Sequence, residues 1–239
     1  MNPGDVIEKM SSTGLIAACH PGNEASILNI IKASYKGGLR VFEMKHHRED
    51  RSFYLFKRIQ EETKNLHLLC LGAGGVPDAA SAEIYLQNGA HFILSPFLNK
   101  DMAALCSDHG KLWVPGCASL KEVETAVNMG AQVVKIQTAN LLGLSFFKEV
   151  NHYFPDLHLI PSGSISDKES ELLSWYRADT LCVQITHELF NKESVGLKDW
   201  AGIEFRVFSF MQRIKRIRSS MNTFDKSIRT ELTFKSINS

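Results

Sequence analysis

Residues 112–137 read LWVPGCASLKEVETAVNMGAQVVKIQ and contain one complete strand–helix–strand unit. The apolar run Leu112–Gly116 predicts a strand, and Ser119 with Glu122 three positions later has the pattern of a helix capping box. A glycine ends the helical stretch, and a second apolar run follows at Val133–Gln137. Because a strand that returns parallel to its neighbour needs a helical crossover, this unit predicts a parallel sheet.

Apolar runs of the same kind recur along the chain, and their starts lie 20 to 27 residues apart. This is the length of one strand plus one helix, and segments such as Asn23–Tyr35 and Pro77–Asn88 have helical start and stop signals. The alternation predicts an α/β fold, the (β/α)8 TIM barrel, with an open doubly wound sheet as the alternative. No GxGxxG pattern follows the first run, which counts against the open sheet. The eight predicted strands are Leu15–His20, Arg40–Lys45, His67–Gly72, Phe92–Pro96, Leu112–Gly116, Val133–Gln137, His158–Pro161 and Thr180–Ile185.

An additional helix is predicted near the C-terminus, where apolar residues between 202 and 221 recur at helical spacing. We expect this helix to cover the barrel and to leave a solvated basic face, with binding of an acidic partner or nucleic acid as the alternative. Residues 1–221 would then form a single barrel domain, and residues 222–239 a C-terminal tail that is mobile or docks on a neighbouring subunit. The apolar stripe is Ile203, Val207, Phe210, Met211, Ile214 and Ile217, and the basic residues are Arg206, Arg213, Lys215, Arg216 and Arg218.

The composition excludes several classes of protein. Hydrophobic residues make up 44% and charged residues 22% of the 239 positions, which is ordinary for a soluble globular chain. The net charge of +1 gives no global field for nucleic acid, and no apolar run reaches the roughly 18–20 residues of a membrane span. The polar N-terminus lacks a secretory signal, and the five cysteines contain no CxxC pair. We therefore expect a cytoplasmic protein with buried cysteines, no nucleic-acid partner and no membrane partner.

Two charged residues interrupt predicted strands: Glu43 lies in VFEMK (41–45) and Lys135 lies in VVKIQ (133–137). A charge inside an apolar strand is costly unless it is paired or used in chemistry, so a structural ion pair or an outward-pointing position is the alternative. Burial lowers the pKa of a lysine, and the neutral amine can form a Schiff base with a keto group while a nearby carboxylate moves protons. Because the active sites of such barrels lie at the carboxyl ends of the strands, this pair predicts a class I aldolase.

Six short motifs in a fixed order give the sequence a family resemblance. They are GGLRVFE (37–43), GAGGV (72–76), GAHFILSP (89–96), VPG (114–116), VK (134–135) and PSGSIS (161–166). Over about residues 15–190 the chain resembles the pyruvate-forming aldolases that cleave 2-keto-3-deoxy-6-phosphogluconate and 4-hydroxy-2-oxoglutarate. The resemblance implies a (β/α)8 barrel, a homotrimer, no metal, no cofactor, and cleavage of a small-molecule 2-oxo acid to pyruvate and an aldehyde. Carried over by position, it makes Lys135 the Schiff-base lysine and Glu43 the general acid and base.

The sequence departs from the family pattern around the predicted substrate. The arginine that helps to hold the substrate carboxylate in the family is missing. Lys45 and His47 occupy the positions that share a strand face with Glu43. Lys45 either binds the substrate carboxylate or only pairs with Glu43. Gly75 replaces a threonine, and Gln184-Ile185-Thr186 replaces a Gly-Gly-Ser phosphate loop. Since glycines let backbone N–H groups approach phosphate, this replacement predicts weak selectivity for phosphorylated substrates. The predicted substrate-binding residues are Lys45, His47, Gly74, Gly75, Pro96, Gly163, Ser164 and Thr186.

Other interpretations stay open. The departures favour a catalytically silent barrel that binds a sugar acid or a protein partner, whereas the retained Lys135 and Glu43 favour an enzyme. The histidines between residues 20 and 47 fit no standard metal-ligand spacing. Further candidates for substrate contacts or for structural roles at the rim are His20, Asn140 and Ser162.

Overall fold

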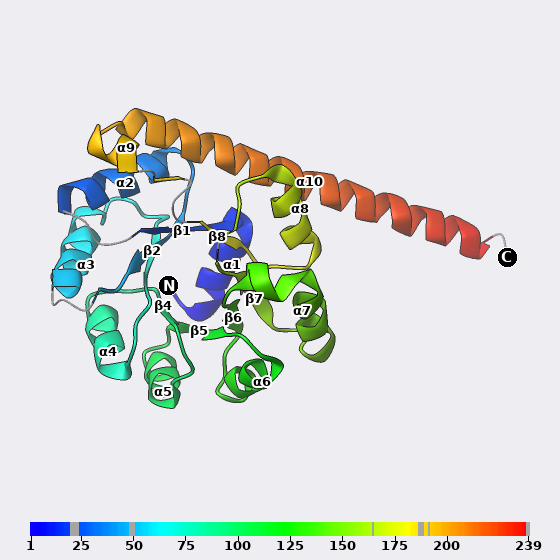
Figure 1. Cartoon of the computed structure of the whole chain (residues 1–239), viewed down its shortest axis with the longest axis horizontal. Helices are drawn as coiled ribbons and strands as arrows, with labels where there is room; N and C mark the ends of the chain where they lie inside the picture. Colours follow the sequence, from blue (N-terminus) through cyan, green and yellow to red (C-terminus); the bar gives the residue numbers. More distant parts are fainter. Residues whose placement is uncertain (20–23, 48–50, 164, 186–188, 191, 238–239) are drawn as a thin grey trace.

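The computed structural model of the chain describes residues 1–19, 24–47, 51–163, 165–185, 189–190 and 192–237. A circle of strands lies inside a ring of helices (Figure 1). The strands are β1 Leu15–Cys19, β2 Val41–Lys45, β3 Cys70–Gly74, β4 Phe92–Ser95, β5 Leu112–Cys117, β6 Val133–Ile136, β7 His158–Pro161 and β8 Val183–Ile185. The helices are α1 Pro3–Thr13, α2 Glu24–Lys36, α3 Arg51–Glu62, α4 Ala79–Gln87, α5 Lys100–Asp108, α6 Leu120–Asn128, α7 Ala139–Tyr153, α8 Glu169–Arg177, α9 Lys192–Gly196 and α10 Trp200–Ile237.

The eight strands form one parallel sheet in the order β7-β6-β5-β4-β3-β2-β1-β8. A parallel bridge between Leu159 and Thr180 joins β7 to the segment that leads into β8 and so brings the two edges together. The predicted (β/α)8 TIM barrel is therefore confirmed, and the open doubly wound sheet is excluded.

The third strand begins later than the sequence pattern suggested. Residues from His67 onward were predicted as strand, but the backbone N–H groups of Leu66 and Leu69 donate at 2.8 Å to carbonyl oxygens three residues earlier, as in turns. Leu68 is consequently 52% exposed. The pairing of β3 with β2 continues instead to the end of both strands, which places Gly74 inside the strand at the open end of the barrel.

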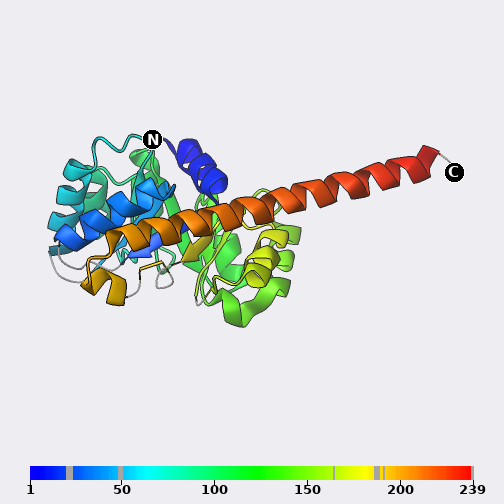
Figure 2. The ribbon, with the colours of Figure 1, turned by 90° about the horizontal axis from the view of Figure 1, so that it is seen from above.

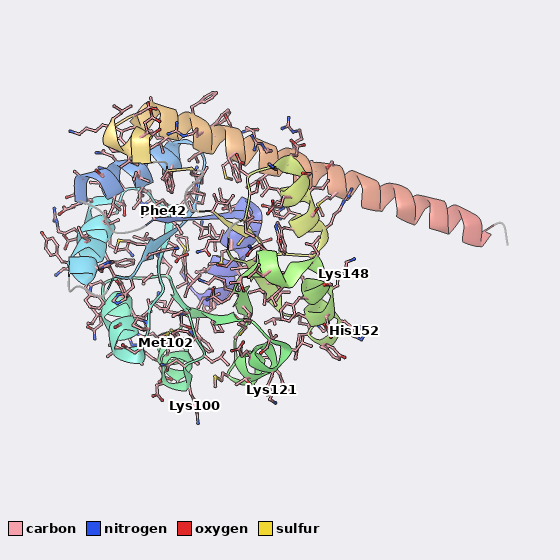
Figure 3. The ribbon with its side chains drawn as sticks, in the orientation of Figure 1. Phe42, Lys100, Met102, Lys121, Lys148 and His152 are labelled. Atoms are coloured by element: carbon pink, nitrogen blue, oxygen red, sulfur yellow. The ribbon has the colours of Figure 1, made fainter. Side chains whose placement is uncertain are left out.

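Side chains alternate between the barrel interior and the layer beneath the helices. The inward positions of the lower barrel are apolar and include Ile16, Val41 and Phe92. Outward positions such as Phe42 belong to a second apolar cluster beneath the helices, whereas Lys121 points away from the ring of helices into solvent (Figure 3). At the carboxyl ends of β2, β6 and β8 the buried inward residues are instead the polar Glu43, Lys135 and Gln184, so polar side chains lie at the end of the barrel where such enzymes bind substrate.

Helix α1 covers the opposite end of the barrel, although no sequence pattern had indicated this helix. Asn2 caps it, because its Oδ1 accepts from the Asp5 N–H at 2.9 Å while the Asp5 carboxylate accepts from the Asn2 N–H at 2.9 Å. Val6 and Met10 are fully buried in the inner apolar cluster. The open end of the barrel is therefore the one at the carboxyl ends of the strands.

Helix α10 lies along α2 and α8 and continues beyond the barrel (Figures 1 and 2). The predicted covering helix is confirmed by its buried stripe of Ile203, Val207, Phe210, Ile214 and Ile217. Its basic face is only partly solvated, which corrects the prediction. Arg213 contacts Asp167 at 3.6 Å and Arg216 contacts Glu169 at 3.5 Å, so these arginines attach the helix to the start of α8. The helix runs on past Met221, the predicted end of the barrel domain.

All five cysteines are buried and free of disulfides, as expected from their apolar surroundings. Within the described ranges, no helix is both long enough and apolar enough to cross a membrane.

Candidate active site

Three polar side chains point into the barrel near its open end: Glu43 from β2, Lys135 from β6 and Gln184 from β8. Each alternates with apolar neighbours that face the outer cluster, so the strand geometry turns all three inward. They are 1%, 7% and 7% exposed, respectively. The structure thus brings together Glu43 and Lys135, the pair that the sequence marked as catalytic.

The carboxylate of Glu43 is held on two sides. Gln184 Nε2 donates a hydrogen bond to Oε2. On the other side lies Gly74, where any Cβ atom would overlap with Oε1 and with the carboxyl carbon. Gly74 was predicted to touch the substrate, and its evident role in the structure is to leave room for this carboxylate.

The amine of Lys135 is buried and lacks a bonding partner among the described residues. In the part of the chain that the structure describes, Nζ makes no hydrogen bond and no ion pair. Desolvation by burial lowers the pKa of Lys135; the negative charge of Glu43 opposes this shift and the positive charge of Lys45 adds to it. Burial outweighs the attraction to Glu43, so the site favours the neutral, nucleophilic amine more than water does.

Lys45 is half-buried at the end of β2, two residues beyond Glu43. Its charge acts on Lys135, so the two lysines lie near the same region of the barrel. Among the described residues Lys45 forms no ion pair with Glu43, which counts against the alternative that it only pairs with that carboxylate.

Glycine and proline residues form part of the rim above these side chains. Gly75 has a φ of +70° and open space where a Cβ would lie, so a threonine here would need a left-handed backbone. Gly163 has a φ of +117°, and a Cβ there would meet Asn140 Oδ1 at 2.7 Å. The carbonyl of Pro96 accepts from Gln137 Nε2 at 3.4 Å, which links the end of β4 to the end of β6. The substrate contacts assigned to Gly75, Pro96 and Gly163 stay predictions.

His47 lies past the end of β2, where strand alternation no longer sets the direction of its side chain. Its N–H donates to Ser52 Oγ at 3.1 Å and its carbonyl accepts from the same hydroxyl at 3.1 Å. His46 faces the helices, with Nδ1 3.0 Å from the Tyr85 hydroxyl, and burial lowers its pKa. The strand therefore does not align His47 with Glu43, and a role for His47 in substrate binding stays a prediction.

Some predicted candidates cannot be placed. Ser164, Thr186 and His20 lie outside the described residues. Ser162 follows β7 directly, and its N–H donates to the Ile136 carbonyl at 3.0 Å. Across the described ranges, no three His, Cys, Asp or Glu side chains are grouped to hold a metal ion.

Gln184 is the site residue whose role the sequence reasoning missed. It was compared only with the family's phosphate loop, whereas it lies within β8, inside the predicted strand Thr180–Ile185 and in register with Ile16 of β1. The available signal was its position, because Gln184 interrupts an apolar run in the same way as Glu43 and Lys135 interrupt theirs.

The fold and this site define the class of the protein as a (β/α)8 barrel with a lysine–carboxylate site at its open end. The model of one family, the KDPG and KHG aldolases, matches residues 6–205. The chain belongs to this family, which is a family of carbon–carbon lyases.

Similar proteins agree with the family assignment. The chain is 30% identical over 137 residues to the 2-dehydro-3-deoxy-phosphogluconate aldolase of Treponema pallidum, a match that spans 57% of this chain and 63% of that relative. It is 27% identical over 161 residues to the Haemophilus influenzae aldolase of the same name, spanning 67% of this chain and 74% of the relative. Among solved structures, the KDPG aldolase of Legionella pneumophila has a TM-score of 0.76 at 18% identity, covering 85% of this chain and 97% of that one. The structural match supports the fold.

Proposed function

We propose that this protein is a class I aldolase that cleaves a 2-keto-3-deoxy sugar acid, or a related 4-hydroxy-2-oxo acid, to pyruvate and an aldehyde. The observation that carries the proposal is the buried amine of Lys135, which has no bonding partner among the described residues and whose pKa is lowered by burial, in the same barrel interior as the carboxylate of Glu43. The names of the relatives support the substrate class. The Legionella aldolase has been captured with pyruvate as a covalent carbinolamine, which supports the same chemistry for Lys135.

The reaction follows from the amine. Neutral Lys135 Nζ attacks the C2 carbonyl carbon, and its proton passes to the carbonyl oxygen. The resulting hydroxyl group takes a second proton from the carboxylic acid form of Glu43 and leaves as water, which gives a protonated imine and the Glu43 carboxylate. Removal of the proton from the C4 hydroxyl breaks the C3–C4 bond, and the electron pair moves to the imine nitrogen, which leaves an aldehyde and an enamine. Protonation of the enamine at C3 and hydrolysis release pyruvate and return the amine. Glu43 shuttles these protons, directly or through a water.

Lys45 supplies the positive charge for the substrate carboxylate. It stands at the open end of β2, it is half-buried, and its charge reaches Lys135. A single ammonium group can pair with a carboxylate, although it lacks the two-pronged geometry of the arginine that it replaces in the family pattern.

The predicted homotrimer and the cytoplasmic location belong to this proposal. The trimer rests on the family resemblance, and light scattering of the purified protein should give three times the mass of one chain. A monomer at micromolar concentration would reject it. The cytoplasmic location rests on the free, buried cysteines and is tested by cell fractionation.

Borohydride trapping tests the proposal. The protein is incubated with pyruvate, reduced with borohydride, digested and examined by mass spectrometry. We expect the mass of reduced pyruvate on the peptide that contains Lys135, and no adduct in Lys135→Met. Lys148→Met is the matched control, because it removes an exposed lysine of α7 and keeps both Lys135 and Lys45.

Two results would overturn the proposal. An adduct that persists in Lys135→Met, or that maps to Lys45, would show that Lys135 is not the Schiff-base lysine. A wild-type protein that forms no adduct and releases no pyruvate from 2-oxo acids is the catalytically silent barrel instead.

A further inference from the structure

We propose that Gln184 is a positioning residue that holds the Glu43 carboxylate away from Lys135 and so keeps the amine of Lys135 free to react. The catalytic meaning of this inference rests on the proposed function. In the family pattern a glycine stands at this position, so the amide is a property of this chain.

The barrel geometry explains how Gln184 reaches Glu43. In the strand registers, Gln184 pairs with Ile16 while Glu43 pairs with Ala18, so Gln184 starts one inward position lower on the far side of β1. Ala18 carries only a methyl group and leaves a path for the longer amide side chain across β1. Gln184 Nε2 then donates to Glu43 Oε2. Both groups are buried, so this hydrogen bond fixes the position of the Gln184 amide and of the Glu43 carboxylate at the same time.

The hydrogen bond from Gln184 competes with an ion pair. Glu43 and Lys135 are close enough for the carboxylate charge to act on the amine, yet they form no ion pair in the described structure. The backbone at Gly74 closes another side of the carboxylate. Without the amide of Gln184, the carboxylate is free to turn toward the ammonium form of Lys135, on which its charge already acts. An ion pair would stabilise the protonated amine, which cannot attack a carbonyl group.

The experiment measures the free amine directly and needs no aldolase activity. Wild type and Gln184→Leu are methylated with formaldehyde and cyanoborohydride across a range of pH, and the labelling rate of the Lys135 peptide is followed by mass spectrometry. Loss of the amide should raise the pH midpoint of labelling by about one unit, so that labelling near neutral pH is about tenfold slower. Gln184→Asn should shift the midpoint in the same direction, because its shorter side chain does not reach Glu43, and it serves if the leucine variant folds poorly.

A matched control and a double variant separate positioning from a general structural role. Gln60→Leu removes another hydrogen-bonded glutamine amide, which donates to the Gly89 carbonyl from the outer helix α3, and should leave the Lys135 midpoint unchanged. If Gln184 acts through the carboxylate, adding Gln184→Leu to Glu43→Gln should cause no further shift.

The inference is wrong if the midpoint in Gln184→Leu matches that of wild type, or if the same shift persists in the Glu43→Gln background. It is also wrong if Lys135 is not labelled at any pH, since the amine would then not be free. These outcomes differ from those that would reject the proposed function. The proposed function fails if Lys135 of the wild-type protein is labelled by formaldehyde but forms no adduct with pyruvate.

Discussion

Replacing Gly74 with alanine should displace the proposed acid–base group without touching the lysine. A Cβ at this position would overlap with Oε1, the carboxyl carbon and Cγ of Glu43, far inside the roughly 3.5 Å of a normal contact. Rotation of the carboxyl group alone cannot relieve an overlap with three atoms, so the whole side chain must swing away and lose its place beside Gln184. Overpacking of this kind costs about 1–3 kcal/mol of stability. Because general acid–base catalysis contributes about 100-fold to 10,000-fold in rate, we expect kcat to fall by at least about 100-fold.

Pyruvate release from 4-hydroxy-2-oxoglutarate measures kcat, and thermal unfolding measures the cost in stability at about 2–4 °C per kcal/mol for a chain of this size. Borohydride trapping at Lys135 should still occur in the variant at alkaline pH, where the amine is neutral even if the displaced carboxylate lies beside it. Gly196→Ala is the matched control, since a Cβ at Gly196 meets nothing within 4 Å. A Gly74→Ala protein with the kcat and melting temperature of wild type would refute this placement of the Glu43 carboxylate.

Two further predictions concern the substrate. Lys45→Met should weaken pyruvate binding and move imine formation to higher pH, because the charge of Lys45 lowers the pKa of Lys135. Borohydride trapping as a function of pyruvate concentration and pH measures both effects. Unchanged pyruvate affinity together with reduced stability would assign Lys45 a structural role only. Phosphorylated and unphosphorylated keto-deoxy acids should differ little in kcat/KM, because Gln184 and Ile185 are buried in β8 and are not part of an open glycine loop, and a preference of about 1,000-fold for the phosphorylated substrate would contradict this reasoning.

The barrel could be predicted from sequence because its signals are local and repeated. Apolar runs buried on both faces, with capped helices between them, leave few alternatives to a closed parallel sheet. The errors occurred where local signals were ambiguous. Leu68 extends an apolar run but lies in a turn, and the polar segment that forms α1 gave no sign that Val6 and Met10 would be buried beneath the barrel.

The site could be predicted only in part, because its contacts join strands that are distant in sequence. Glu43 and Lys135 were detectable as charges in apolar strands. The hydrogen bond from Gln184 crosses 141 positions of sequence, and the role of Gly74 depends on the direction of a side chain from another strand. Strand alternation predicts which face a residue occupies, but not the neighbour that its side chain reaches.

The buried lysine should also lower the stability of the protein, in a way that depends on pH. Burial lowers the pKa of Lys135 from 10.5 in the folded state, so below the folded-state pKa the folded protein holds a buried ammonium group at a cost of about 1.4 kcal/mol for each unit of the shift. The cost declines as pH rises from the folded-state pKa toward 10.5, and above 10.5 the amine is neutral in both states and the cost is absent. Lys135→Met removes the charge and nearly preserves the volume, so it should be more stable than wild type near neutral pH, with an advantage that shrinks at alkaline pH. Urea unfolding of both proteins at pH 7 and pH 10 measures the difference between their free energies of unfolding. The titration of other groups contributes equally to both proteins and cancels in this difference. Two results would contradict this prediction: Lys135→Met is less stable than wild type at pH 7, or its gain in stability over wild type does not change with pH. Either result would show that the ammonium of Lys135 is well compensated in the folded protein. Lys135 would then not be the destabilised, reactive group on which the proposed chemistry depends.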